Sequence, residues 1–170
     1  MYKIRFYRLG FAVLAALAMA IPIWTWAGGD MPRAYWTDPI TDTNLNTSLN
    51  MGDSSRILRL NAEVPAGKML KAWKISLKYD AAKISVENVT APAESPFKQI
   101  NMNKGEGGII TTNAFDVKGV KGPASIPFLD VKVKTVIAGT SDLVVSFDKY
   151  GASKQDEFRP DKLSLNLQKY

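Results

Sequence analysis

KAWKISLKY, residues 71–79, carries the clearest secondary-structure signal in this chain. Apolar residues at positions 73, 75, 77 and 79 alternate with polar residues at positions 74, 76 and 78. A period of two residues is typical of a β-strand that buries one face and exposes the other to water. The stretch RILRLNAEVP, residues 56–65, repeats this alternation and leads into a Pro-Ala-Gly turn. Both stretches therefore predict half-buried strands.

Similar extended segments, separated by turn signals, continue to the C-terminus. They lie at residues 83–91, 97–102, 109–115, 126–137, 142–147 and 163–167. No segment after residue 27 keeps the 3.6-residue period of an amphipathic helix. We expect an all-β sandwich or barrel of about nine strands over residues 45–170. Residues 28–44 are rich in Gly, Pro, Asp and Thr, so we expect an irregular leader there.

The N-terminal segment has the layout of a secretory signal. Three basic residues precede the apolar run FAVLAALAMAI, residues 11–21, and small residues follow. We expect a signal helix over residues 1–27 with cleavage after Ala27, while cleavage after Ala20 and retention as a membrane anchor stay open. The signal predicts a secreted or extracytoplasmic protein, and the sequence leaves periplasm, cell surface and medium open.

The composition excludes several classes of chemistry. The 170 residues include no Cys and no His, which excludes disulfides, zinc–thiolate sites, cysteine nucleophiles and the commonest general base. Residues 1–27 hold three of the 22 basic residues and none of the 16 acidic ones, so the remainder carries a net charge of +3. That charge is too small to indicate nucleic acid as a partner. No nucleophile elbow, phosphate loop or nucleotide fingerprint is present, so we predict that the chain is not an enzyme.

Five segments in a fixed order carry a resemblance to a known family. The segments are residues 56–64, WKISLKYD at 73–80, KISVENV at 83–89, LDVKVKTVIAGTSDL at 129–143 and the ending at 147–167. Together they resemble the cohesin domain of bacterial cellulosome scaffolds. The resemblance implies a nine-stranded jelly-roll β-sandwich, with relatives among carbohydrate-binding modules of similar topology, so the fold alone leaves the function open.

The resemblance also implies a partner and a binding face. In cohesins one sheet face of the sandwich docks a dockerin, a small helical protein that itself binds calcium. The strand at residues 71–79 would belong to that sheet, so Lys74, Ser76, Lys78 and Asn113 are the candidate partner contacts. Lysines there would favour an acidic partner and accelerate its encounter. The alternative, that these are ordinary solvent-exposed residues without a binding role, also stays open.

Two other functions remain open at this stage. One is polysaccharide binding, for which Tyr35 and Trp36 are the candidate aromatic contacts; both could instead contact a protein partner or pack on the edge of the sandwich. The other is a structural subunit of a surface appendage or matrix, joined through strand edges. Trp73 shares a face with apolar neighbours, so we expect it in the core.

Calcium is the metal that the composition leaves open. Two clusters bring oxygen ligands close together in the sequence: Asp38, Asp42 and Asn44, and Asn101, Asn103 and Glu106. Neither has the twelve-residue loop with a terminal bidentate Glu that an EF-hand uses. We therefore expect no metal site and no cofactor in this chain and place calcium on the partner, although calcium binding by this chain stays open.

Overall fold

The structure is a computed structural model that describes residues 31–45 and 47–170. Strands dominate this part of the chain, with one short 3₁₀ helix, η1, at Lys154–Asp156. The strands are β1 (Ala34–Asp38), β2 (Thr43–Leu45), β3 (Ser48–Asn50), β4 (Arg56–Val64), β5 (Met69–Lys78), β6 (Ile84–Thr90), β7 (Ile100–Gly105), β8 (Ile109–Lys121), β9 (Ala124–Thr135), β10 (Gly139–Gly151) and β11 (Leu163–Lys169). The expected signal segment, residues 1–27, lies outside the described residues.

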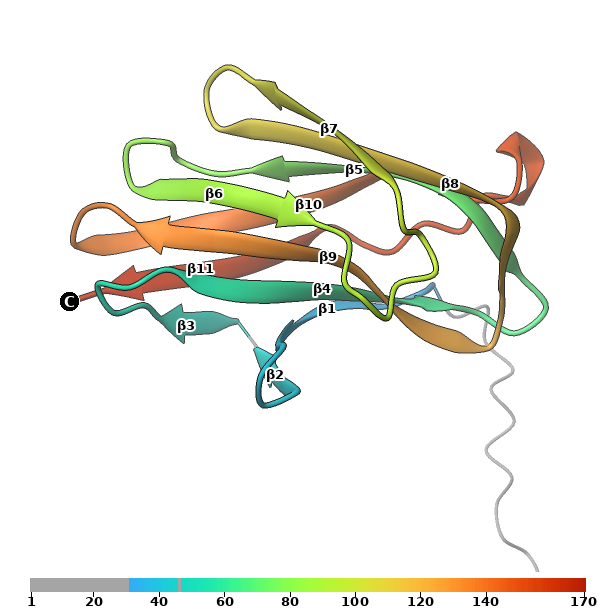
Figure 1. Cartoon of the computed structure of the whole chain (residues 1–170), viewed down its shortest axis with the longest axis horizontal. Helices are drawn as coiled ribbons and strands as arrows, with labels where there is room; N and C mark the ends of the chain where they lie inside the picture. Colours follow the sequence, from blue (N-terminus) through green and yellow to red (C-terminus); the bar gives the residue numbers. More distant parts are fainter. Residues whose placement is uncertain (1–30, 46) are drawn as a thin grey trace, which may run out of the picture.

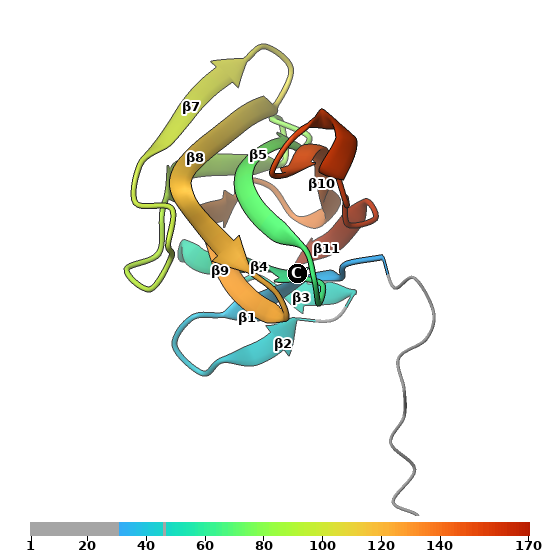
Figure 2. The same cartoon turned by 90° about the vertical axis from the view of Figure 1, so that its right-hand side faces the viewer.

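The strands form two sheets that pack face to face. One sheet has the order β2-β1-β4-β9-β6, and the other has the order β3-β11-β10-β5-β8-β7. Figures 1 and 2 show these sheets as the two layers of a β-sandwich. All pairings are antiparallel except that of β11 with β3. The prediction of an all-β sandwich is confirmed.

The core lies between the sheets and is built by the alternation seen in the sequence. Trp73, Ile75 and Leu77 of β5 are all 1% exposed or less, as are the matching inward residues of β4. Trp73 packs edge-on against Phe128, with ring centroids 5.3 Å apart, and against Phe97 at 6.0 Å. Edge-to-face aromatic pairs add about 1 kcal/mol each beyond area burial. The expectation that Trp73 is a core residue is confirmed.

A buried tyrosine connects the two sheets. Tyr150 of β10 donates its hydroxyl hydrogen to the backbone oxygen of Glu63 in β4, at 3.0 Å. Burial raises the pKa of the Tyr150 hydroxyl, so this group stays protonated and keeps donating at ordinary pH. The bond satisfies a polar atom that would otherwise be buried without a partner.

The structure differs from the sequence expectation at the leader. Residues 34–38 and 43–45 form strands β1 and β2 of the first sheet, where we expected irregular chain. β1 pairs with β4, with Trp36 opposite Leu60. Burying the Trp36 ring and completing the edge of β4 stabilise a strand whose own residues give only a weak extended signal.

Strand boundaries also differ around β7. The strand covers residues 100–105, not 97–102, because Phe97 turns into the core, where it is 1% exposed. β8 continues through residue 121, beyond the expected end at residue 115. Asp116 accepts the backbone N–H groups of Lys118 and Gly119, which shapes an irregular stretch inside this long strand.

The two ends of the described chain lie at opposite ends of the sandwich. Ala34 pairs with Ala62 near the end of β4, whereas Lys169 pairs with Gly139 at the start of β10 (Figure 1). Within residues 31–45 and 47–170, no helix has the length and apolar character needed to cross a membrane.

Candidate functional site

The candidate partner contacts lie on one surface of the larger sheet. We call the outward side of β5, β8 and β10 the open face. Lys74 and Lys78 of β5 are exposed there and Ser76 is half-buried, because the residues between them point into the core. Strand alternation therefore places all three on the solvent side, as the sequence predicted.

The register brings Asn113 to the same place. Lys74 lies opposite Asn113 of β8, and Ser76 lies opposite Thr111. The Asn113 side-chain oxygen accepts a hydrogen bond from Asn101 Nδ2 on β7, at 3.3 Å. Opposite residues of an antiparallel pair have their Cβ atoms about 5 Å apart, so these side chains form one continuous polar surface.

β10 adds two charged residues that the sequence did not reveal. A bulge between Phe147 and Lys149 inserts Asp148, which accepts a hydrogen bond from the Ser76 hydroxyl at 2.6 Å. The same bulge places Lys149 opposite Lys74. Nothing in the local sequence marks the bulge, and the strand expected from the sequence ended at residue 147.

The open-face lysines have no charged partners among the described residues. Of the ion pairs found there, none includes Lys74, Lys78 or Lys149. Like charges directly opposite each other on a sheet lower its stability by a few tenths of a kcal/mol. The Lys74–Lys149 juxtaposition therefore contributes nothing to folding and leaves cationic charge available for an external group.

An exposed aromatic residue borders this charge. Phe115 of β8 is 66% exposed and follows Asn113 by two residues, so it lies on the same side of the strand. Ile109, at the other end of this row, is 41% exposed. The sequence could have predicted this exposed aromatic residue. In the strand IITTNAF, residues 109–115, side chains two positions apart share a face, so an outward Asn113 implies an outward Phe115.

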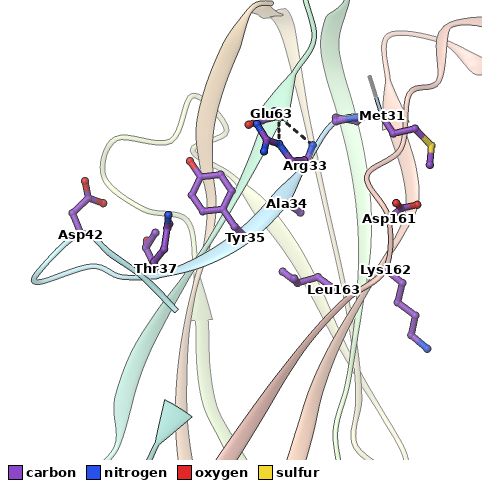
Figure 3. A pocket seen from close by; sticks show the side chains of 12 residues that line it. Met31, Arg33, Ala34, Tyr35, Thr37, Asp42, Glu63, Asp161, Lys162 and Leu163 are labelled. Carbon is purple, nitrogen blue, oxygen red and sulfur yellow. Dashed lines mark hydrogen bonds and ion pairs between the residues drawn. The ribbon is translucent and has the colours of Figure 1, made fainter. Parts of the chain in front are cut away.

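The two aromatic candidates near the N-terminus point in opposite directions. Trp36 is fully buried against the core, so the expectation that it offers an exposed aromatic contact is wrong. Tyr35 is half-buried on the other side of β1, and its hydroxyl lies 2.7 Å from the Ser125 hydroxyl. Tyr35 lines a cavity, which Figure 3 shows from close by.

The first of the two oxygen-rich clusters holds a turn together. One carboxylate oxygen of Asp38 accepts hydrogen bonds from the backbone N–H groups of Ile40 and Thr41. The other oxygen accepts a hydrogen bond from Arg56 Nη2 at 2.9 Å. The N–H of Ile40, with smaller contributions from Thr41 and Arg56, lowers the pKa of the Asp38 carboxyl. Within the described residues, no group of three or more His, Cys, Asp or Glu side chains could hold a metal ion.

The second cluster is spread along an edge strand. Asn101 and Asn103 lie on β7, and Glu106 lies in the turn that follows. Asn101 donates to Asn113 across the strand pair. This amide is therefore engaged with the open face.

Solved structures with the same arrangement of strands identify the fold. A comparison with known protein families gave no match, and neither did a comparison with curated proteins. Among solved structures, a non-cellulosomal cohesin from Archaeoglobus fulgidus superimposes with a TM-score of 0.61 at 12% identity, over 83% of this chain and 92% of that one. The chain has the cohesin fold.

Two further structures support this cohesin-like assignment. A cohesin in a type I cohesin–dockerin complex from Clostridium thermocellum has a TM-score of 0.60 at 12% identity, covering 83% of this chain and all of that one. The seventh type I cohesin of the ScaB scaffold from Pseudobacteroides cellulosolvens has a TM-score of 0.59 at 15% identity, covering 82% and 92%. The cohesin-like resemblance found in the sequence is thus confirmed at the level of the fold.

Proposed function

We propose that this chain is a non-catalytic recognition module that binds another protein through its open face. The observation that carries the proposal is the exposed Phe115 beside the unpaired Lys74 and Lys149. Aromatic residues, Phe included, are enriched in protein interfaces, and cations around them steer an oppositely charged partner. Asn113, opposite Lys74, and Ser76, two residues further along β5, provide hydrogen-bonding groups on the same face.

The partner that this face fits is an acidic protein of dockerin type. Lys74, Lys78 and Lys149 outnumber the outward carboxylates of Asp142 and Asp148, so the face has an excess of positive charge. Such charge steers an acidic partner toward the face and suppresses basic ones. The cohesins from Clostridium thermocellum and Acetivibrio cellulolyticus were solved in complex with dockerins, which supports a partner of dockerin type.

We place the module outside the cytoplasm. The basic and then apolar composition of residues 1–27 supports export, and the absence of Cys and His from the whole chain suits a binding role better than catalysis. Mass spectrometry of the native protein checks the export step. An N-terminus at residue 28 or 21 is expected, and a protein that begins at Met1 would contradict cleavage.

Affinity capture tests the binding function. Residues 28–170, immobilised, are incubated with extracytoplasmic extract from the source cells, with and without a calcium chelator. We expect an acidic protein that is retained by the wild type, lost with Phe115→Ala and released by the chelator. Lys134→Ala is the matched control, because Lys134 is an exposed lysine on the outer side of the other sheet.

Three results would count against this reading. Retention that Phe115→Ala and Lys74→Ala leave unchanged would move the interface elsewhere on the chain. Recovery of no protein, at concentrations where a complex with a Kd of about 1 μM would be retained, would reject a recognition module. Self-association that grows with concentration in light scattering would favour a structural subunit joined through strand edges instead.

A further inference from the structure

A cavity of about 650 Å³ lies between β1 of the smaller sheet and the start of β11. Arg33, Tyr35, Asp42, Glu63, Asp161 and Lys162 contribute to its lining. Figure 3 shows their side chains arranged along β1, with Asp42 at one end and Asp161 and Lys162 near the other. No residue of the open face lines it. Its volume is within the range of about 300–1,000 Å³ that small-molecule sites occupy.

The cavity exists because two short strands cover only half of this side of the sandwich. β2 pairs with residues 36–38 of β1, and β3 pairs with residues 166–168 of β11. Residues 34–35 and 163–165 therefore have no strand neighbour on that side. Ala34, Tyr35 and Leu163 belong to these uncovered stretches and line the cavity. The uncovered strand edges add backbone hydrogen-bonding groups to the lining.

Some charged side chains of the cavity lining pair with each other, and others have no hydrogen-bond or ion-pair partner among the described residues. Glu63 is engaged, since its carboxylate accepts the Arg33 backbone N–H at 3.3 Å and pairs with the Arg33 side chain at 3.5 Å. The exposed side chains of Asp42, Asp161 and Lys162 form no hydrogen bond or ion pair with any described residue. Two carboxylates and one ammonium group can thus meet a ligand, and these three lining groups sum to a charge of −1. The Asp42 carboxylate also interacts electrostatically with the Arg59 guanidinium, which does not line the cavity.

These groups select among ligand classes. The surplus carboxylate disfavours phosphates, uronates and other anions. The polar and exposed rim disfavours a purely apolar ligand, because burying these groups without hydrogen bonds costs free energy. A neutral ligand with many hydroxyls meets both conditions, since carboxylates accept hydrogen bonds from hydroxyls and the lysine donates to them.

The ring of Tyr35 supplies an apolar surface inside the cavity. Its hydroxyl forms a hydrogen bond of 2.7 Å with the Ser125 hydroxyl, which restricts the orientation of the ring in the lining. A fixed aromatic ring offers an apolar surface at low cost in conformational entropy. We propose that this cavity binds a neutral oligosaccharide chain, whose sugar ring packs on Tyr35 while its hydroxyls bond to Asp42, Asp161 and Lys162. This function is separate from the protein recognition assigned to the open face.

Titration calorimetry and amide NMR shifts of residues 28–170 test the proposal. The probes are cellohexaose, xylohexaose and mannohexaose, with tetragalacturonate as an anionic comparison. We expect at least one neutral hexaose to bind and to shift amides of residues 33–37 and 161–163. We expect Tyr35→Ala and Asp161→Ala each to weaken binding at least tenfold, and Tyr35→Phe, which keeps the ring, to weaken it by less.

The controls separate this site from the open face and from misfolding. Lys74→Ala and Phe115→Ala should leave sugar binding unchanged. Asp161 is an exposed loop residue, so Asp161→Ala still tests the site if Tyr35→Ala fails to fold. The proposal is overturned if no neutral hexaose shifts the cavity amides at about 5 mM, where a complex with a Kd of about 1 mM would be mostly formed. Preferred binding of tetragalacturonate, or shifts confined to the open face, would overturn it equally.

Discussion

The outer faces of the two sheets use charge in different ways. On the smaller sheet, the side formed by β4, β9 and β6, which we call the paired face, places Arg59 opposite Asp130 with two hydrogen bonds of 2.8 and 2.9 Å. Lys132 there pairs with Glu87 at 2.9 Å. On the open face, Lys74 and Lys149 lie opposite each other without a carboxylate partner.

This contrast separates charges that hold the fold from charges that face outward for a partner. The hydrogen bonds with Asp130 raise the pKa of Arg59, and the hydrogen bond with Lys132, followed by that with Ser55, lowers the pKa of Glu87. Each shift favours the charged form, so these groups stabilise the folded state as ions. The open-face lysines make no comparable contacts. Four measurements test this difference between the two faces.

Loss of the bidentate pair on the paired face should give the largest effect. Arg59→Ala removes both hydrogen bonds and leaves Asp130, whose side chain is 18% exposed, without its cation. We expect the free energy of unfolding to fall by about 2–3 kcal/mol, with partner binding unchanged. Urea denaturation of Arg59→Ala and of the control Lys134→Ala measures it. If the two variants were equally stable, the Arg59–Asp130 pair would have no structural role.

Truncation of the open-face aromatic should act on binding alone. Phe115→Ala removes a ring that is already 66% exposed, so the stability should change by less than about 0.5 kcal/mol. Partner affinity should fall about tenfold or more, as for a residue at the centre of an interface. Surface plasmon resonance with the captured partner gives the affinity. A variant that loses stability but keeps its affinity would reverse the assignment of the two faces.

Removal of open-face charge should have a smaller effect, mainly on the association rate. In the double variant Lys74→Ala, Lys149→Ala, the rate should fall by about two- to fivefold at low salt and by less at high salt. The stability should stay constant or rise slightly, because two opposed cations are gone. Stopped-flow kinetics at two ionic strengths tests this. A faster dissociation rate with unchanged association would argue against steering.

The smallest predicted effect is the loss of folding stability contributed by Asp38 at low pH. The pKa of Asp38 is lowered in the folded state, so its stabilising contribution is present above its unfolded pKa of about 3.9 and is lost as the pH falls through the folded value. Asp38→Asn keeps an oxygen that can accept the Ile40 N–H but cannot ionise. The variant should be less stable than the wild type at pH 6, and the difference should shrink below about pH 4. A constant difference from pH 6 to pH 2 would contradict the linkage.

The sequence predicted those parts of the fold in which each residue's face follows from alternation. In residues 56–64 and 71–78, a period of two assigns each side chain to a face without any knowledge of the partner strand. The placement of Lys74, Ser76 and Lys78 on the solvent side followed directly. Their proximity to Asn113 needed only the antiparallel pairing of β5 with β8.

The remaining features depend on contacts that are distant in the sequence. AYWTD, residues 34–38, contains two adjacent aromatic residues, and only the packing of β1 on β4 decides that Trp36 is buried and Tyr35 is not. The bulge that aligns Lys149 with Lys74 follows from the fit of β10 to β5. The cavity depends on how far β2 and β3 extend along their neighbours, which no local pattern encodes.

The placement of the chain ends has a mechanical consequence. Because Ala34 and Lys169 lie at opposite ends of the sandwich, a force that separates them acts along the strands. In that direction the seven residue pairs between β10 and β11 are loaded in shear, so that their hydrogen bonds resist together and do not open one at a time. A module held at one end and pulled from the other is therefore built to carry tension.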